Sequence, residues 1–243
     1  MSFAIAKAGQ ALKHLYYRAQ MPSMRYPDFG SFAICYGEIY RRRIYHFKHF
    51  KIRANEAVIL DVGANIGLFA LWAASEYKPK TIFSYEASPV TYEFLLGNLS
   101  RHSGATTMVP IHAAVSSVAD QELTIYHRAD LAVASTVLAA GKTLGQPYPV
   151  KSTTLSRQIT ERGIEMVDLL KIDVEGHVMQ VLEGLEQADF DRIRNVVLEC
   201  DWVPEGAPEP TKVARLLEER GYRVETGGDP SDSNNVTLFA HRP

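Results

Sequence analysis

Acidic, amide and glycine residues stand around one sharp predicted turn, at Asp61, Gly63, Asn65 and Gly67. The four residues before Asp61 are apolar, which predicts a buried parallel strand that runs through the turn into a helix. Gly63 allows the backbone to turn and a ligand to approach it, and Gly67 allows the new helix to pack tightly on the sheet. This spacing is typical of a site for a nucleotide-like ligand.

The spacing of the glycines distinguishes between ligands. Dinucleotide sites use a G-x-G-x-x-G pattern, whose second glycine makes room for a pyrophosphate. Here Asn65 stands at that position, and Asp61 places a carboxylate just before the turn. The pattern favours a cofactor that has no pyrophosphate and carries positive charge for an acid to meet. S-adenosylmethionine, with its sulfonium and ammonium groups, fits both conditions.

A second acid, Glu86, ends the next predicted strand, 23 residues after Gly63. Folds of this type place the carboxylate that accepts the ribose hydroxyls at about this distance. We expect Glu86 to bind the ribose, the alternative being a glutamate that only caps the next helix. We expect Asp61 to hold the methionine end of the cofactor through water or its ammonium group, the alternative being a turn-stabilising aspartate.

Ligands of open parallel sheets bind beyond the carboxyl ends of the strands, so the strand ends supply the remaining candidates. The residues expected to contact the cofactor are Asp61, Gly63, Ala64, Asn65, Gly67, Phe69, Glu86, Ala87, Ser88, His112, Ala113, Ala114 and Asp173. Two further acids, Glu199 and Asp201, close the fifth predicted strand at the same edge.

Three candidate catalytic residues, Asp173, Glu175 and His177, follow the fourth predicted strand. Methyl transfer from a sulfonium requires the protein to align the acceptor and, for a hydroxyl, to remove a proton. His177 is predicted in the first turn of a helix, where the dipole disfavours imidazolium, so it is a candidate neutral base; the alternative is a surface or capping histidine. Asp173 is expected to position the methionine moiety or the acceptor hydroxyl. Glu175 does the same or satisfies backbone amides.

These carboxylates and His177 also suggest a metal site. No His-x-x-x-His motif and no cluster of cysteines accompanies them, so we predict no catalytic metal. Cys35 and Cys200 are too few for a disulfide framework, which favours a reducing compartment. The sequence also has no predicted membrane span or signal peptide, and we expect a cytoplasmic protein.

Strands and helices alternate from Val58 onward, which predicts a doubly wound, mostly parallel α/β sheet of the Rossmann-like type. The predicted strands are 58–62, 81–86, 107–115, an edge strand 122–127, 167–173, 194–199, and a final antiparallel pair 222–225 and 236–240. The predicted helices are 66–76, 89–99, 176–185 and 211–220. Residues 130–149, rich in small residues, are predicted to form a long loop near the ligand.

Residues 1–55 are predicted to be an N-terminal extension of a main domain at 56–243. They hold ten Lys/Arg and two Asp/Glu, a net charge of +8, which leaves −10 for the rest of a chain whose total is −2. Helical spacing occurs over 3–19, and 32–36 is predicted to form a short strand. The extension is interpreted either as a helical cap whose aromatic residues pack on the main domain or as a lid over an anionic substrate.

Three sequence blocks occur in a characteristic order: 60–67 (LDVGANIG), 85–89 (YEASP) and 170–176 (LKIDVEG), the last followed by VLEG at 181–184. Together they resemble the FkbM-type methyltransferases, over roughly residues 56–199. The resemblance implies a seven-stranded class I methyltransferase domain that binds S-adenosylmethionine and methylates oxygen atoms of sugars, polysaccharides or secondary metabolites. The chain departs from the family's usual small residue and acid at His177 and Val178.

Three other functions stay open at this point. Asn65 speaks against an NAD(P)-dependent oxidoreductase. A nucleic-acid methyltransferase would suit the basic extension, but the pI of about 6.5 and the lack of an Asn/Asp-Pro-Pro-Tyr/Phe segment disfavour it. The third is a non-catalytic cofactor-binding module. The expected partner is a small-molecule or glycan acceptor. If the positive charge of the extension serves to bind the acceptor, we expect the acceptor to carry phosphate. Assembly into a homo-oligomer is also compatible with the sequence.

Overall fold

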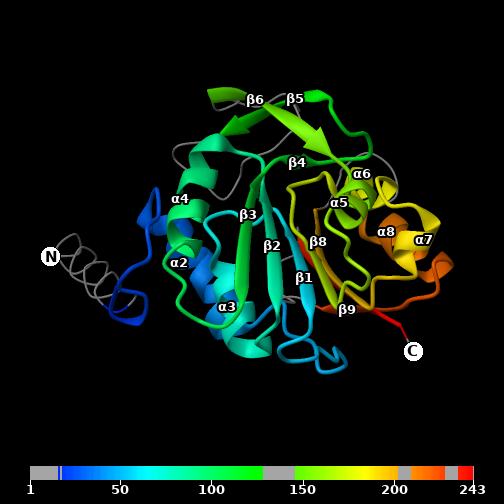
Figure 1. Ribbon diagram of the computed structural model, residues 1–243, viewed down its shortest axis with the longest axis horizontal. Helices are drawn as coiled ribbons and strands as arrows, with labels where there is room; N and C mark the ends of the chain where they lie inside the picture. Colours follow the sequence, from blue (N-terminus) through cyan, green and yellow to red (C-terminus); the bar gives the residue numbers. More distant parts are fainter. Residues whose placement is uncertain (1–15, 17, 128–145, 202–208, 228–234, 243) are drawn as a thin grey trace, which may run out of the picture.

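The main sheet has seven strands in the order β3-β2-β1-β7-β8-β10-β9 in this computed structural model, which describes residues 16, 18–127, 146–201, 209–227 and 235–242. The first five strands in this order are parallel, and β10 runs antiparallel to both of its neighbours. Helices cover both faces of the sheet (Figure 1). The predicted doubly wound, mostly parallel α/β fold is confirmed.

The elements have the following bounds. The strands of the main sheet are β1 (Val58–Val62), β2 (Thr81–Glu86), β3 (Thr107–His112), β7 (Leu169–Ile172), β8 (Asn195–Asp201), β9 (Arg223–Gly227) and β10 (Asn235–His241). A smaller sheet contains β4 (Ala114–Val115), β5 (Glu122–His127) and β6 (Gln146–Thr153). The helices are α2 (Phe29–Tyr36), the π-helix η1 (Gly37–Arg42), α3 (Leu68–Tyr77), α4 (Pro89–Leu99), α5 (Leu155–Glu161), α6 (Val178–Glu183), α7 (Gln187–Phe190) and α8 (Glu209–Glu219).

Alternate residues of the central strands face two separate hydrophobic cores, as the two-residue period of a strand requires. Leu60 and Leu170 pack with α5, α6 and α8 on one face of the sheet. Ile59 and Leu169 pack with α2, α3 and α4 on the other face. The same alternation decides on which side of the sheet the polar residues of these strands lie.

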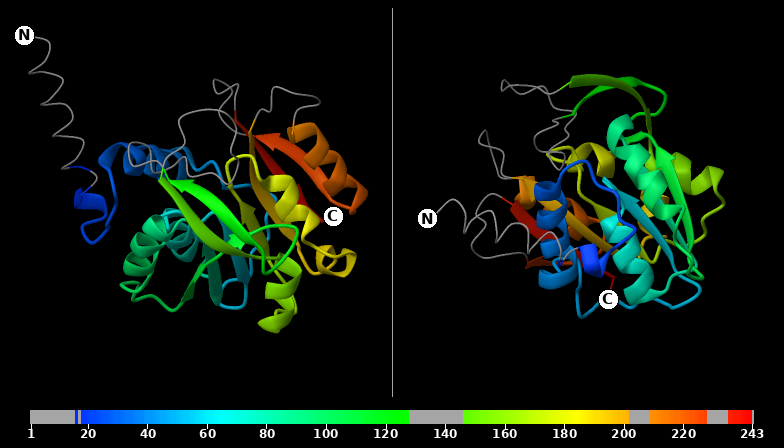
Figure 2. Two further views of the ribbon diagram at one scale, coloured as in Figure 1. Left: turned by 90° about the horizontal axis from the view of Figure 1, so that it is seen from above. Right: turned by 90° about the vertical axis from the view of Figure 1, so that its left-hand side faces the viewer.

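The N-terminal extension packs on the face covered by α3 (Figure 2). Phe32 and Tyr45 belong to the same buried cluster as Phe69 and Trp72 of α3. Aromatic packing on the main domain therefore occurs, whereas the domain boundary after residue 55 stays a prediction. Most of the predicted helix 3–19 lies outside the described residues.

Two predicted elements are wrong in type or extent. Residues 32–36 belong to a helix, because Asp28 accepts a hydrogen bond from the Ser31 amide at 2.7 Å and so starts α2. The strand predicted over 107–115 is broken after His112, and its second part, β4, pairs with β6. The predicted edge strand 122–127 is confirmed as β5, which lies at the edge of the smaller sheet and pairs with β6.

The predicted loop 130–149 ends earlier than expected. Gln146 already belongs to β6, which pairs with β5, and residues 130–145 lie outside the described chain. Within the described residues, every helix is too short or too polar to cross a membrane.

Gly67 offers a test of the packing between α3 and α4. Its φ angle is +90°, and a Cβ atom at this position would lie 3.0 Å from side-chain atoms of Leu95 and Leu99. We expect Gly67→Ala to lower the free energy of unfolding by about 2–4 kcal/mol, through left-handed strain and overpacking. Urea unfolding measures the loss.

Gly163→Ala is the matched control, since Gly163 also has a positive φ of +60° but no atom lies within 4 Å of the place that a Cβ atom would take. Its loss should be only the strain of about 1–2 kcal/mol. Equal losses of unfolding free energy in the two variants would show that contact of the added methyl group with α4 does not destabilise the protein.

Candidate functional site

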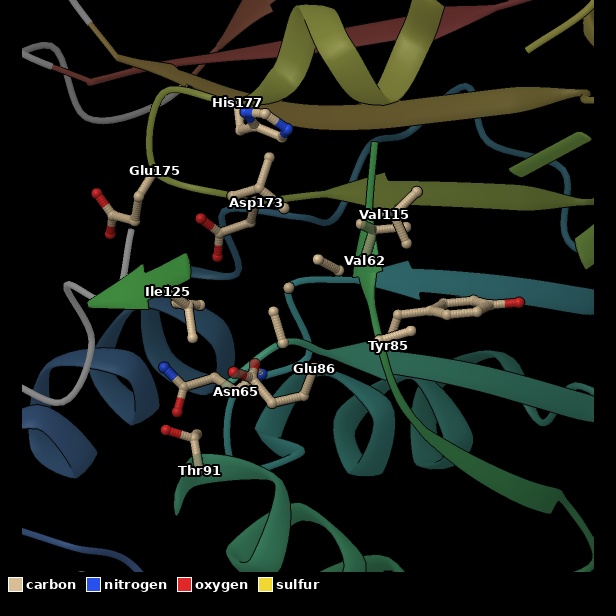
Figure 3. Close-up of a pocket in the computed structure, with 15 residues that line it drawn as sticks. Val62, Asn65, Tyr85, Glu86, Thr91, Val115, Ile125, Asp173, Glu175 and His177 are labelled. Carbon is tan, nitrogen blue, oxygen red and sulfur yellow. Dashed lines mark hydrogen bonds between the residues drawn. The ribbon is translucent and has the colours of Figure 1, made fainter. Parts of the chain in front are cut away.

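A pocket of about 650 Å³ opens at the carboxyl ends of β1, β2 and β7. Figure 3 shows Asp173, Glu175 and His177 along one wall, with Asn65, Glu86 and Thr91 along the opposite wall. The described lining residues are Val62, Gly63, Asn65, Tyr85, Glu86, Ala87, Thr91, Ala113, Ala114, Val115, Ile125, Asp173, Val174, Glu175 and His177.

All three candidate catalytic residues and seven of the expected cofactor residues line this pocket. Those placed outside its wall are Asp61, Ala64, Gly67, Phe69, Ser88 and His112. Ser88 caps α4, and His112 stacks on Tyr92 with a centroid distance of 5.0 Å. Ala64 and Phe69 line a neighbouring cavity of about 380 Å³ between the turn and the extension. Contacts of these six residues with a cofactor stay predictions.

Gly63 allows the ends of two strands to approach one another. Its φ angle is +75°, and a Cβ atom here would lie 1.7 Å from the carbonyl oxygen of Asp173. The amides of Gly63 and Ala64 both donate to the carbonyl oxygen of Tyr85, at 3.0 and 2.9 Å. The backbone at the end of β7 therefore leaves no room for a side chain at position 63.

Glu86 combines a capping role with a place in the pocket. Its carboxylate accepts hydrogen bonds from the amides of Asn65 at 2.9 Å and Ser88 at 2.8 Å. Burial raises the pKa of Glu86 to about 7, and the two amides limit the rise. Glu86 thus changes charge near neutral pH while facing the ligand space.

Asp61 lies beneath the turn, where it meets Lys171. The two residues are opposite one another in the parallel pairing of β1 and β7, and Lys171 Nζ is 3.2 Å from Asp61 Oδ1. Nζ also donates to the carbonyl oxygen of Gly63 at 2.8 Å and is 3.4 Å from Asp173 Oδ2. Burial raises the pKa of Asp61, and Lys171 opposes this rise. Burial lowers the pKa of Lys171, but neighbouring carboxylates outweigh it and raise that pKa above its ordinary value.

Tyr45 of the extension reaches this cluster from the opposite side. Its hydroxyl is 3.0 Å from Asp173 Oδ2 and also contacts the carboxyl group of Glu199. The ring packs edge-on against Phe69 at a centroid distance of 5.3 Å. Nothing in the sequence pattern identified Tyr45, whereas a lysine within the apolar run of β7 is a recognisable sign of a buried ion pair.

His177 directly precedes α6 and is buried, with 8% of its surface exposed. Its Nε2 atom is 3.1 Å from the hydroxyl oxygen of Ser116, while its Nδ1 atom is buried without a hydrogen bond in the described structure. Burial lowers the pKa of His177, which favours the neutral imidazole. The cause is desolvation rather than the helix dipole that the sequence suggested.

Glu175 lies at the exposed rim, where Glu175 and Gly176 both have positive φ angles, of 42° and 81°. Among the described residues, no group of three His, Cys, Asp or Glu side chains is arranged to hold a metal ion.

The described basic residues of the extension are absent from the described pocket wall. Arg42 pairs with Glu38, and Arg43 pairs with Glu76. His49 and Lys51 line a groove at the opposite end of the main sheet, together with Arg194, Asn195, Arg223, His241 and Arg242. The net positive charge of the extension therefore adds no described cation to the pocket wall. Its described cations lie in ion pairs or in the groove at the opposite end of the sheet.

Known proteins resemble this chain in sequence and in fold. It is 33% identical to the 31-O-demethyl-FK506 methyltransferase FkbM of Streptomyces tacrolimicus, over 83% of this chain and 85% of that protein. It is 26% identical to the hexuronic acid methyltransferase AglP of Haloferax volcanii, over 69% of this chain and 64% of that protein. A methyltransferase FkbM from Methylobacillus flagellatus KT shares the fold, with a TM-score of 0.54 and 14% identity over 86% of this chain and 51% of that chain.

The family model of the methyltransferase FkbM domain matches residues 61–224, well over half of the chain. This match includes the turn after β1, Glu86, and the acids at the end of β7. The chain therefore belongs to the FkbM methyltransferase family, whose methyl donor is S-adenosylmethionine.

Proposed function

We propose that this protein is an O-methyltransferase that acts on a hydroxyl group of a small-molecule or glycan acceptor. The observation that carries the proposal is the carboxylate of Asp173 at the pocket wall, held by Lys171 at 3.4 Å and by Tyr45 at 3.0 Å. A fixed carboxylate next to the ligand space can orient a hydroxyl and take its proton. The relatives named for 31-O-demethyl-FK506 and for a hexuronic acid support an oxygen acceptor.

The pocket suits S-adenosylmethionine, which supplies an electrophilic methyl group when bound. Glu86 can accept hydrogen bonds from a ribose diol, because its buried carboxylate lies at the wall. The apolar side of the pocket, with Ala114, Val115 and Ile125, suits an adenine ring. The methionine end then belongs near Gly63 and Asp173, where a carboxylate can meet its positive charge.

Asp173 is the preferred proton acceptor on geometric grounds. Both ring nitrogens of His177 are covered, one by Ser116 and the other by surrounding atoms. Asp173 keeps 35% of its side-chain surface exposed. Glu175, exposed at the rim, is assigned to contact with the acceptor. His177 is assigned to shaping the same wall and excluding water from it.

The family assignment favours methyl transfer over nicotinamide chemistry, and the acceptor proposed here distinguishes the protein from nucleic-acid methyltransferases. A non-catalytic module would bind the cofactor and transfer nothing to any acceptor. A cytoplasmic location stays a prediction. Cys35 and Cys200 are both free thiols, which is compatible with it.

Adenosine binding tests the role of Glu86 without the charges of the methionine end. The ionised carboxylate accepts both ribose hydrogens, and its pKa is about 7. Adenosine affinity of the wild type should therefore rise between pH 6 and pH 8 and then level off. We expect Glu86→Gln to bind about 10-fold to 100-fold more weakly at pH 8 and to lose this pH dependence. Calorimetry that finds equal affinity would remove Glu86 from the ribose site.

A comparison of Asp173→Asn with His177→Ala tests the proton acceptor. Loss of a positioned base typically lowers the rate about 10²-fold to 10⁴-fold, so we expect that loss in kcat for Asp173→Asn. His177→Ala should lower kcat by less than about tenfold, since its nitrogens are covered. Single-turnover assays with labelled methyl donor measure both rates, and His49→Ala, at the opposite end of the main sheet, is the control. The reverse order of effects would make His177 the base.

A panel of hydroxyl acceptors tests the reaction and the charge of the substrate together. The described pocket wall carries Glu86, Asp173 and Glu175 but no lysine or arginine. We therefore expect labelled methyl groups to reach neutral glycosides at least as fast as their phosphate esters. Added salt should change the rates by less than about twofold.

Two results would change these proposals. A strong preference for phosphate esters that salt abolishes would restore the anionic acceptor suggested by the extension. Cofactor binding without transfer to any hydroxyl, amine or nucleic acid would favour the non-catalytic module.

A further inference from the structure

The hydroxyl group of Tyr45 lies between two carboxyl groups of neighbouring strands. It is 3.0 Å from Oδ2 of Asp173, which follows β7, and it also contacts Oε1 of Glu199 in β8. Tyr45 is only 3% exposed, so bulk water does not compete for these contacts. A tyrosine hydroxyl has one hydrogen and can donate to only one of the two carboxyl groups at a time. The second hydrogen bond needs a hydrogen from a carboxylic acid.

Glu199 is the group that holds this second hydrogen. Burial raises the pKa of Glu199 to about 8, and the negative charge of Asp173 adds to the rise. Burial and the same two acids also hold the pKa of Tyr45 well above its ordinary value, so its hydroxyl stays protonated. At neutral pH, the protonated Glu199 can donate to the oxygen of Tyr45, and Tyr45 can donate to Asp173.

Several described elements contribute charge around Glu199. The titratable and charged groups that act on Glu199 or respond to it, from α2, η1, the segment after η1 and β7, are Cys35, Glu38, Tyr45, Lys171 and Asp173. Lys171 and the Tyr45 hydrogen bond lower the pKa of Glu199, while Glu38 raises it. The carboxyl groups of Glu38, Asp173 and Glu199 outnumber the single ammonium group of Lys171. This excess of acids explains why one carboxyl group retains a proton.

We propose that Tyr45 is a positioning residue of the methyl-transfer site, whose hydroxyl holds the carboxylate of Asp173 in place while it accepts a hydrogen bond from protonated Glu199. This role rests on the proposed function, in which Asp173 takes the acceptor proton. Tyr45 and Lys171 both contact Oδ2 of Asp173, so Oδ1 is available to the acceptor hydroxyl. In the methyl transfer that a bound sulfonium donor would supply, the methyl–sulfur bond would break and leave a neutral thioether, the acceptor oxygen would gain the methyl group, and the proton of its O–H bond would go to Asp173.

The fold of the extension brings Tyr45 to this position. Arg43 ends η1 with a left-handed φ of 55°, which redirects the chain toward the sheet. The guanidinium group of Arg43 pairs with Glu76 and lies 5.9 Å from the ring centre of Trp72 in α3. Two residues later, Tyr45 enters the buried cluster. The extension thus supplies part of the site through Tyr45, apart from any role as a lid.

Kinetic assays of Tyr45→Phe and Glu199→Gln test this role in the full-length protein. Tyr45→Phe should lower kcat at least about tenfold and change the KM for S-adenosylmethionine by less than about twofold. Tyr222→Phe is the matched control, because its buried hydroxyl lies within hydrogen-bond distance of the carbonyl oxygens of Phe190 and Ile193 on another part of the fold. A Tyr45→Phe enzyme with wild-type kcat would overturn the proposal.

The pH profile separates positioning from simple packing. Above about pH 8, Glu199 becomes ionised and competes with Asp173 for the single hydrogen of Tyr45, so wild-type kcat should fall. Glu199→Gln imitates the protonated carboxyl group. It should keep kcat within about threefold at pH 7 and lose the alkaline decline. An unchanged alkaline decline in Glu199→Gln would contradict the arrangement.

Carbon NMR of the carboxyl groups gives a readout that needs no acceptor. In the wild type, the resonance that disappears in Glu199→Gln should titrate near pH 8. Tyr45→Phe should raise that pKa, because a hydrogen bond to the ionised form is the stronger one, and Asp173→Asn should lower it by removing a negative charge. A titration with these shifts supports the network even if no acceptor is methylated. Methyl transfer without these shifts overturns the network and leaves the proposed function standing.

Discussion

The carboxyl edge of the sheet depends on one buried ammonium group. Lys171, with 3% of its side chain exposed, lies between Asp61 and Asp173, at 3.2 and 3.4 Å from their carboxylates. Strand pairing creates the first contact, since Asp61 and Lys171 are opposite one another in β1 and β7. Removing one partner of such a buried pair typically costs about 3–5 kcal/mol, because the other charge is left without compensation. The pair thus fixes the end of β1 against the end of β7, where the pocket opens.

The alternation of side chains explains why the extension is needed at this edge. Lys171 in β7, and Asp173 directly after it, alternate onto the same side as Leu169, and Glu199 shares a side of β8 with Val197. Leu169 and Val197 belong to the core that α3 and the extension cover. These polar side chains therefore lie on the side of the sheet that the extension covers, where a residue of the extension can form hydrogen bonds with them. Tyr45 does so.

The sequence predicts the main sheet well because its strands are continuous apolar runs with clear ends. The polar wall of the pocket was also predictable, since the ends of parallel strands meet at one edge. Short apolar stretches were less informative: residues 32–36 suit a strand or a helix, and only the Asp28 cap decides. Pro147 and Pro149 conceal β6 in the sequence. Tyr45 could not be predicted, because 128 residues separate it from Asp173 and no periodic pattern links them.

The charge of the buried cluster connects its stability with its chemistry. Full ionisation of Asp61, Asp173 and Glu199 beside Lys171 would leave a net charge of −2 in a buried region, which desolvation makes unfavourable. One retained proton, on Glu199, reduces this to −1. The further proton that the proposed reaction would deliver from an acceptor hydroxyl would bring the cluster to neutrality. The proposed transfer of a proton to Asp173 would therefore reduce an excess of negative charge that burial disfavours.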